Sequence, residues 1–218
     1  MEELIIKIKN DSPSANLTII NNGLEKKKNI STEDLTSHLV SDYKLNTGLL
    51  PTGTRYFSGA KSNYNISIEL PAKIRSMKVY SSGSRKKEVM EIPFPVCSFN
   101  FNIQNYELRD TRIFSMKHPL QTEKDAMYCF PFGNVYGDGR VCWGSVKLSK
   151  VSKPMELVSI ITLFLGSEFN GDLANNFNTK DKVGNFWELI AHLKDKTEFS
   201  LDFLRATNMN LNNIFQER

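Results

Sequence analysis

Apolar residues alternate with polar ones in two long stretches of the chain, and this pattern constrains the fold more than any other feature. In residues 64–70, every second residue is large and apolar: Tyr64, Ile66, Ile68 and Leu70. In residues 96–103, one side carries Cys97, Phe99, Phe101 and Ile103, and the other carries Val96, Ser98 and Asn100. A period of two is that of a β-strand. Together with shorter candidates at 77–80 and 112–116, these stretches predict a meander of strands.

The last third of the sequence changes to the period of a helix. Residues 155–165 are densely apolar, begin after Pro154 and end at Gly166, which predicts a mostly buried helix. Residues 186–193 have the spacing of a second packed helix, and two short apolar clusters within 201–215 are also expected to be helical. Strands followed by helices predict an α+β fold.

The N-terminal residues carry their own strand and helix signals. Residues 4–9 and 16–20 read as strands, followed by a turn at 21–23. Ser31 or Thr32 can cap a helix that runs to about Val40, with Leu35, Leu39 and Val40 on one face. The Pro and Gly within 49–54 then punctuate the chain. We therefore expect residues 1–48 to form an extension of strands plus helix packed on the core, and residues 49–218 to form the main domain.

Length and composition are those of a soluble globular protein that needs no covalent or metal cross-link to be stable. A chain of 218 residues can bury roughly 70 % of its unfolded surface, so it needs neither a disulfide nor a structural metal. The three cysteines, Cys97, Cys129 and Cys142, lack paired spacing and are expected to be reduced thiols. No apolar run approaches the ~18 residues of a membrane span, and the acidic start of the chain is unlike a signal peptide. We expect a cytoplasmic protein.

Charge and histidine patterns favour neither nucleic acid nor metal as a partner. The net charge is +4, and the basic runs at 26–28 and 85–87 are short, so they are interpreted as solvated loop faces. The histidines His38, His118 and His192 are far apart and join no metal-binding pattern. We therefore expect no metal and no cofactor.

Residues 130–144 carry the strongest functional signal. Asn134 precedes Cys142 by eight positions, and the turn residues Gly137-Asp138-Gly139 lie between them. An amide held near a cysteine on an irregular loop suits acyl-thioester chemistry. The thiolate attacks a carbonyl, and a fixed N–H donor stabilises the developing oxyanion.

This segment is similar to the active-site stretch of ubiquitin-conjugating enzymes, the UBC fold. In that family a His-Pro-Asn tripeptide precedes the catalytic cysteine by the same step, and the cysteine follows a Gly-x-hydrophobic triplet, matched by Gly139–Val141. Phe132 stands in place of the histidine and Gly133 in place of the proline, so the loop must be braced by apolar contacts. The resemblance implies an N-terminal helix, a four-stranded antiparallel meander, a catalytic loop and later helices, which agrees with the order expected here over about residues 30–195. Ile92–Pro95 also resembles the family's proline-rich segment; its prolines belong at the edge of a sheet or at the entry to a strand.

A closer similarity is to the bacterial proteins called prokaryotic UBC-like family D, or protein B of the PRTRC system. The matching segments are Leu49–Thr54, Asn134–Gly144, the Trp-centred 186–190 and an Asn-rich tail. Such proteins are encoded beside an adenylating ThiF-like protein and a ubiquitin-like protein. The resemblance therefore implies these two partners, and a carrier that receives an activated C-terminus as a thioester.

Three residues are the candidate site. Cys142 is the expected nucleophile; the alternative is a buried structural cysteine between Val141 and Trp143. Asn134 is the expected oxyanion donor, and it can equally organise the loop as an Asx-turn residue. Asp172 lies thirty positions past Cys142, near where some conjugating enzymes place an acid that orients or deprotonates the incoming lysine, although loop polarity explains it equally well. Cys97 and Cys129 are expected to be core thiols.

The sequence is compatible with two other functions. The loss of His and Pro at Phe132 and Gly133 is compatible with a catalytically silent adaptor that binds the ubiquitin-like protein or its adenylating partner. An approach of His118 to Cys142 in space would instead form a Cys–His dyad and a thiol hydrolase.

Overall fold

A computed structural model describes residues 2–8, 13–41, 48–60, 62–81, 86–174, 176–180 and 183–216. The chain divides into two units, residues 1–46 and residues 47–218, which are described separately. None of the described helices combines the length and the apolar character that crossing a membrane requires.

The first unit is a three-stranded antiparallel sheet followed by a helix. Its strands are β1 (Glu2–Ile8), β2 (Ser14–Asn21) and β3 (Leu24–Ser31), in the order β1-β2-β3, and α1 (Thr32–Ser41) contacts β2 and β3. The predicted turn joins β2 to β3, with Asn22 and Gly23 at positive φ (49° and 82°), as a two-residue hairpin requires. The predicted cap is confirmed, because the Ser31 Oγ accepts a hydrogen bond of 2.9 Å from the Asp34 N–H. Leu35 is buried, while the side chains of Leu39 and Val40 lie outside the described residues.

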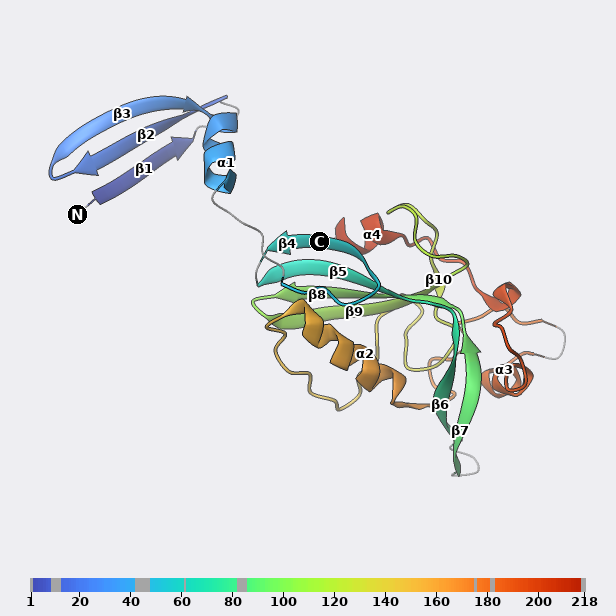
Figure 1. Ribbon diagram of the computed structural model, residues 1–218. Helices are drawn as coiled ribbons and strands as arrows, with labels where there is room; N and C mark the ends of the chain where they lie inside the picture. The colour runs from blue at the N-terminus through green and yellow to red at the C-terminus, as the bar shows by residue number, and fades with distance from the viewer. Residues whose placement is uncertain are drawn as a thin grey trace. The chain divides into compact units, whose positions relative to one another are not determined.

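The second unit is built on a five-stranded antiparallel sheet (Figure 1). Its order is β10-β9-β8-β5-β4, with bounds β4 (Thr54–Ala60), β5 (Asn63–Leu70), β8 (Val96–Gln104), β9 (Glu107–Met116) and β10 (Tyr128–Cys129). The strands predicted at 64–70, 96–103 and 112–116 are confirmed as parts of β5, β8 and β9. The structure adds β4, which the sequence did not predict.

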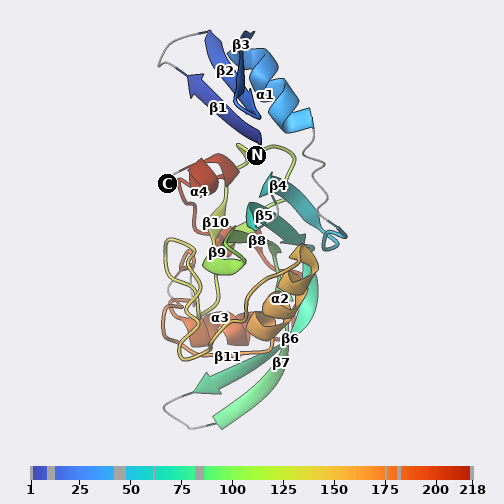
Figure 2. The ribbon, with the colours of Figure 1, turned by 90° about the vertical axis from the view of Figure 1, so that its left-hand side faces the viewer.

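Between β5 and β8 the chain leaves the main sheet and forms a hairpin, which extends at the lower end of this unit in Figure 2. It consists of β6 (Lys73–Ser81) and β7 (Lys86–Phe94), and β11 (Glu168–Phe169) joins it in parallel to β6. The strand predicted at 77–80 is confirmed within β6, but it belongs to this second sheet and does not pair with β5. Pro93 lies in β7, an edge strand of this sheet, as predicted for a residue that has no N–H to donate.

One face of the main sheet holds the aromatic core. The alternating residues of β5 and β8 point into it, and α2 (Leu157–Leu165) packs there through Phe164, whose ring centroid lies 5.8 Å from those of Phe99 and Phe130. A 3₁₀ turn, Pro154–Glu156, leads into α2, and Gly166 ends it, as the sequence predicts. The predicted second helix is confirmed as α3 (Phe186–Leu193), which buries Phe186, Leu189, Ile190 and Leu193.

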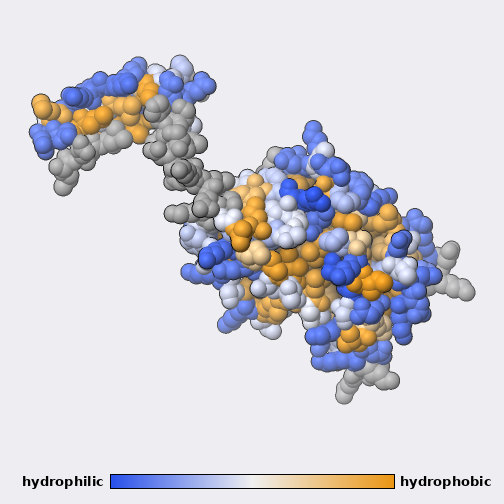
Figure 3. Space-filling view, viewed as in Figure 1, coloured by the Kyte–Doolittle hydropathy of each residue, from blue (hydrophilic) through white to orange (hydrophobic). Residues whose placement is uncertain are grey.

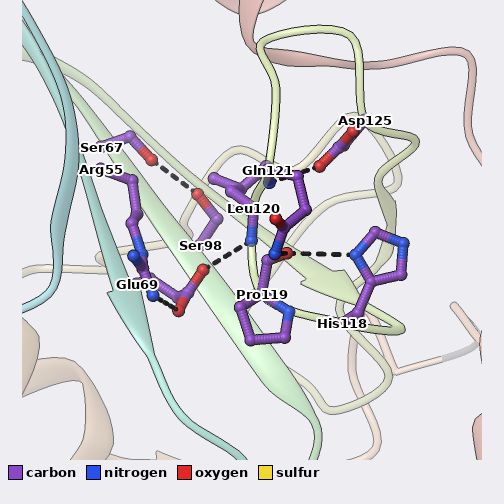
Figure 4. A network of polar contacts seen from close by, with 9 residues as sticks. All are labelled: Arg55, Ser67, Glu69, Ser98, His118, Pro119, Leu120, Gln121 and Asp125. Atoms are coloured by element: carbon purple, nitrogen blue, oxygen red, sulfur yellow. Dashed lines mark hydrogen bonds and ion pairs between the residues drawn. The ribbon is translucent and has the colours of Figure 1, made fainter.

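The opposite face of the sheet carries buried polar groups that tie down a loop (Figure 4). Glu69 accepts a hydrogen bond of 2.8 Å from the Leu120 backbone N–H and pairs with Arg55 at 2.8 Å, which compensates the burial of its carboxylate. Ser67 and Ser98 share a hydrogen bond of 2.8 Å beside it. The C-terminal segment, with a 3₁₀ turn at Leu201–Phe203 and α4 (Leu211–Gln216), completes a smaller apolar cluster on this side through Leu211 and Ile214.

Candidate active site

The loop that leads to Cys142 is hydrogen-bonded to β9 along the edge that does not face β8. Beyond the short pairing of β10 with β9, the Gly139 carbonyl accepts a hydrogen bond from the Ile113 N–H (2.8 Å), and the Val141 N–H donates to the Thr111 carbonyl (2.9 Å). The loop therefore continues the sheet in place of a regular strand, and its position is set by the rigid β9.

The predicted turn closes a short irregular hairpin that brings Asn134 next to Cys142. Gly139 N–H donates to the Tyr136 carbonyl (2.9 Å), Tyr136 N–H donates to the Arg140 carbonyl (2.8 Å), and Val135 forms a bridge with Val141. At the open end, the Cys142 N–H donates to the Asn134 carbonyl at 2.8 Å. The eight-residue spacing thus places the two residues directly opposite each other.

Two glycines allow this loop to pack closely. Gly139 has a φ of 86°, and a Cβ added there would lie 2.4 Å from the ring of Phe114. A Cβ on Gly133 would lie 2.6 Å from the Asn170 carbonyl oxygen. Asn134 itself has a φ of 66°, in the left-handed region that Asn tolerates better than most residues.

Phe132 anchors the loop in the core. It is fully buried, with ring centroids at 4.6 Å from Phe94, 5.4 Å from Phe130 and 6.1 Å from Phe199. The prediction that apolar contacts brace the loop in place of a histidine is confirmed.

The turn is also held by hydrogen bonds of two polar residues further along the chain, Asn176 and Arg205. Asn176 donates to the Val135 carbonyl (2.9 Å) and accepts from Arg205 (2.7 Å), and Arg205 also approaches the Cys129 sulfur at 3.5 Å. Cys129 is buried, as is Cys97, whose burial raises the pKa of its thiol to about 12. Both predictions of core thiols are confirmed.

The Asn134 amide connects the loop to the end of α2. Its Nδ2 donates to the Ser167 Oγ (3.2 Å) and to the Glu168 carbonyl (2.9 Å), so both amide hydrogens have partners. Ser167 in turn donates to the Phe164 carbonyl at 2.6 Å. The amide therefore organises the loop, and its use as an oxyanion donor, which stays a prediction, requires one of these bonds to be exchanged.

Cys142 and Asn134 line one groove of about 390 Å³ between the loop and α2. The rest of its lining is Trp143, Gly144, Val146, Leu163, Phe164, Gly166, Ser167 and Glu168. Leu163 and Val146 are 46 % and 45 % exposed. In Figure 3, the region in which Figure 1 places α2 contains apolar surface next to hydrophilic surface. Cys142 is partly exposed, which separates it from the two core cysteines.

Tyr136 is a residue of this site to which the sequence assigned no role, although it stands within the segment Asn134–Gly144 that carries the family resemblance. Its hydroxyl donates to the Cys142 Sγ at 3.8 Å, and this contact raises the pKa of Tyr136. The guanidinium of Arg140 lies 5.6 Å from the Tyr136 ring centroid. The register of the hairpin is the feature that indicates the contact between Tyr136 and Cys142. Because Val135 faces Val141, residues 134, 136, 140 and 142 lie on one face of the hairpin.

The remaining candidates lie outside the groove. The Asp172 carboxylate accepts from the Asn170 amide (3.2 Å), and its backbone carbonyl lies against Gly133, so its chain is next to the loop although its carboxylate is not among the groove lining. His118 contacts Pro119 in the loop on the opposite face of the sheet (Figure 4), so the Cys–His dyad is not formed. Among the described residues, no group of three or more His, Cys, Asp or Glu side chains could hold a metal ion.

The fold and the site are compatible with an E2-like, that is ubiquitin-conjugating-like, class of domain. They consist of a mixed α+β scaffold with antiparallel sheets and a partly exposed cysteine on a loop beside a groove. A sequence model of prokaryotic E2 family D matches residues 61–206, about two thirds of the chain, and the protein therefore belongs to this family. The comparisons with curated proteins and with solved structures gave no match. Membership indicates a ubiquitin-conjugating-like role, which in general involves a ubiquitin-like protein and an activating enzyme.

Proposed function

We propose that this protein accepts the C-terminus of a ubiquitin-like protein as a thioester on Cys142 and transfers it to a nucleophile. The observation that carries the proposal is the placement of Cys142. Cys142 is partly exposed and lines a groove of about 390 Å³, and its backbone is hydrogen-bonded to Asn134. A cysteine needed only for packing has no reason to line an open groove.

The chemistry has two steps. In loading, the Cys142 thiolate attacks the activated carbonyl, a C–S bond forms, and the activating enzyme's leaving group departs. In discharge, an amine attacks the thioester carbonyl, a C–N bond forms, and the C–S bond breaks with its electron pair on sulfur. An N–H donor near the carbonyl stabilises the oxyanion of each tetrahedral intermediate, and such a donor is worth about 2.7–4 kcal/mol in other enzymes. We assign this role to Asn134.

Asp172 is proposed to orient or deprotonate the incoming amine. Its place on the turn that packs against Gly133 supports this role. Asp172→Asn keeps the shape of the side chain and its contact with Asn170, so it changes the charge with little change in the turn. We expect normal loading and a discharge to amines slowed roughly 10²-fold, the lower end of what a positioned acid–base group contributes.

The partners follow from the similarity of Asn134–Gly144 to protein B of PRTRC cassettes. We propose a ThiF-like adenylating enzyme as the source of the activated C-terminus and a UBC fold as the common scaffold. The antiparallel sheets with α2 beside the loop support that scaffold.

The alternative is an adaptor that binds the ubiquitin-like protein without reacting. One observation favours it, namely that both amide hydrogens of Asn134 are already bonded to Ser167 and Glu168. The partly exposed position of Cys142 at the groove argues against it.

Intact-protein mass spectrometry under non-reducing conditions distinguishes the two functions. The protein is incubated with ATP, the adenylating enzyme and the ubiquitin-like protein. A thiol-sensitive adduct of the ubiquitin-like protein's mass, absent in Cys142→Ala, is the expected result. If the adenylating enzyme charges normally and no adduct forms, the adaptor is the better function.

A further inference from the structure

Tyr136 lies beside the sulfur of Cys142, and the proposed function leaves it without a task. We propose that Tyr136 is a catalytic residue whose hydroxyl hydrogen-bonds the Cys142 sulfur and stabilises the thiolate that leaves when a thioester on Cys142 is broken. This role rests on the proposed function, because it concerns the discharge of the same thioester.

The position of Tyr136 is determined by the backbone of the hairpin. Its N–H donates to the Arg140 carbonyl and its carbonyl accepts from the Gly139 N–H, so the residue is held on both sides. From there the hydroxyl reaches the Cys142 Sγ at 3.8 Å, a length suited to a large sulfur acceptor. With 41 % of its surface exposed, the ring stands beside the sulfur without closing it off from a partner.

The other donors near the sulfur already have acceptors. The Cys142 N–H donates to the Asn134 carbonyl, and the Asn134 amide donates to Ser167 and Glu168. Among the hydrogen bonds of the described residues, the one from Tyr136 is the bond that ends on the Cys142 sulfur. The Tyr136 hydroxyl is therefore the donor placed to stabilise a negative charge on that sulfur.

Neighbouring charges hold the tyrosine ring in place. The Arg140 guanidinium lies 5.6 Å from the ring centroid, within the range of a cation–π contact. Arg140 is held by Asp138, with 2.6 Å between its Nε and the Asp138 Oδ2, and Asp138 also accepts the Arg140 backbone N–H at 3.1 Å. Because contact with Cys142 raises the pKa of Tyr136, the phenol remains a protonated donor throughout the neutral range.

The hydrogen bond has unequal consequences for the two steps. In discharge the C–S bond breaks and sulfur receives the electron pair, so a donor on sulfur stabilises the leaving group. Tyr136 keeps its proton, and the attacking amine gives its proton to Asp172, in the role proposed above, or to solvent base. In loading the sulfur is the attacking group, and a donor bonded to its electron pair lowers its nucleophilicity. Loss of the hydroxyl should therefore slow discharge more than loading.

The test compares Tyr136→Phe with Tyr106→Phe, a similarly exposed tyrosine (38 %) outside the groove. Cys142 is acetylated with p-nitrophenyl acetate, which requires no protein partner, and loss of the adduct to a small amine is followed by intact mass. The thioester is the amine-labile adduct that is absent in Cys142→Ala. We expect Tyr136→Phe to slow this loss roughly three- to tenfold, since a hydrogen bond to a charged group is worth more than a neutral one, while Tyr106→Phe behaves as wild type.

A second readout separates catalysis from folding. The pKa of Tyr136, followed by NMR of ring-labelled tyrosine, should fall towards its ordinary value in Cys142→Ala, because the contact that raises it is gone. Equal discharge rates for Tyr136→Phe and wild type, with equal melting temperatures, would overturn the proposal. Because the acetyl group is installed chemically, this outcome is independent of whether a ubiquitin-like protein can be loaded.

Discussion

At the scale of single residues, Asn134 has two separable tasks. Its backbone occupies the left-handed region at a φ of 66°, and its amide ties the loop to Ser167 and Glu168. Asn134→Gly keeps the backbone conformation and removes only the amide, whereas Asn134→Ala loses both. We expect Asn134→Ala to be less stable than Asn134→Gly by about 1 kcal/mol, the cost of a Cβ in the left-handed region.

Urea unfolding followed by tryptophan fluorescence measures this difference, because Trp143 and Trp187 both lie in the 47–218 unit. Ser167→Ala is the matched control: it removes one amide acceptor, leaves the other, and should cost less than Asn134→Gly. Equal stabilities for the Ala and Gly variants at position 134 would contradict the role of the backbone conformation.

The spacing of the motif was sufficient to predict that Asn134 and Cys142 meet, since a turn between them determines the pairing. The partners of the Asn134 amide could not be predicted in the same way. Ser167 and Glu168 lie 33 and 34 positions further along the chain, and they reach the loop only because α2 packs on the sheet. The contact of Tyr136 with Cys142 was not predicted for a different reason, because it follows from the register of a hairpin that was predicted only as a turn.

At the scale of elements, local signals determined what could be predicted. The helix predicted at 186–193 agrees with α3 because Asn185 caps it, accepting from the Trp187 and Glu188 N–H groups at 3.0 and 3.1 Å. The strand β3 was missed because its lysines at 26–28 resemble a solvated loop. Those lysines are compatible with a strand here, since β3 lies at the edge of its sheet. The placement of β6 in a second sheet depends on distant pairing with β7 and β11, which no local pattern encodes.

The active-site turn provides a prediction at this scale. Gly139 combines a φ of 86° with a Cβ position 2.4 Å from the Phe114 ring, so Gly139→Ala must strain the backbone and displace a buried aromatic side chain. We expect it to lower the free energy of unfolding by about 1–3 kcal/mol, the usual cost of overpacking, and to slow the reaction of Cys142 with iodoacetamide or acetyl donors by moving the loop.

Gly137→Ala, two residues away in the same turn, is the control. A Cβ there would meet its nearest atoms, from Asn176 and Arg205, at 3.6 and 3.7 Å, which is ordinary contact. Its effect should stay within about 0.5 kcal/mol. If both alanine variants lose similar stability, the close approach of Gly139 to Phe114 is not what positions the turn.

At the scale of the whole molecule, the core of the 47–218 unit contains two titratable groups that resist ionisation. Burial raises the pKa of the Cys97 thiol to about 12, and burial raises the pKa of the Tyr64 phenol to about 12, helped by the negative charge of Glu156. In an unfolded chain these groups ionise near 8.5 and 10. The unfolded state therefore loses its protons first as the pH rises. The stability that the two groups contribute is complete below pH ~8.5, starting with Cys97, and is lost progressively towards pH ~12.

The slope of this loss separates Cys97 from Tyr64. Between pH ~9 and ~10, Cys97 alone should lower the free energy of unfolding by about 1.4 kcal/mol per pH unit. Cys97→Ala should be less stable than the wild type at pH 7, because the substitution leaves a cavity in the core beside β8. The stability of this variant should nevertheless change little between pH ~9 and ~10. Cys142→Ala retains Cys97 and should keep the wild-type slope. Urea unfolding at half-unit steps from pH 8 to pH 10 measures all three proteins. Parallel curves for Cys97→Ala and wild type would mean that the thiol of β8 ionises in the folded protein as readily as in the unfolded chain, which its complete enclosure between the sheet and the aromatic core contradicts.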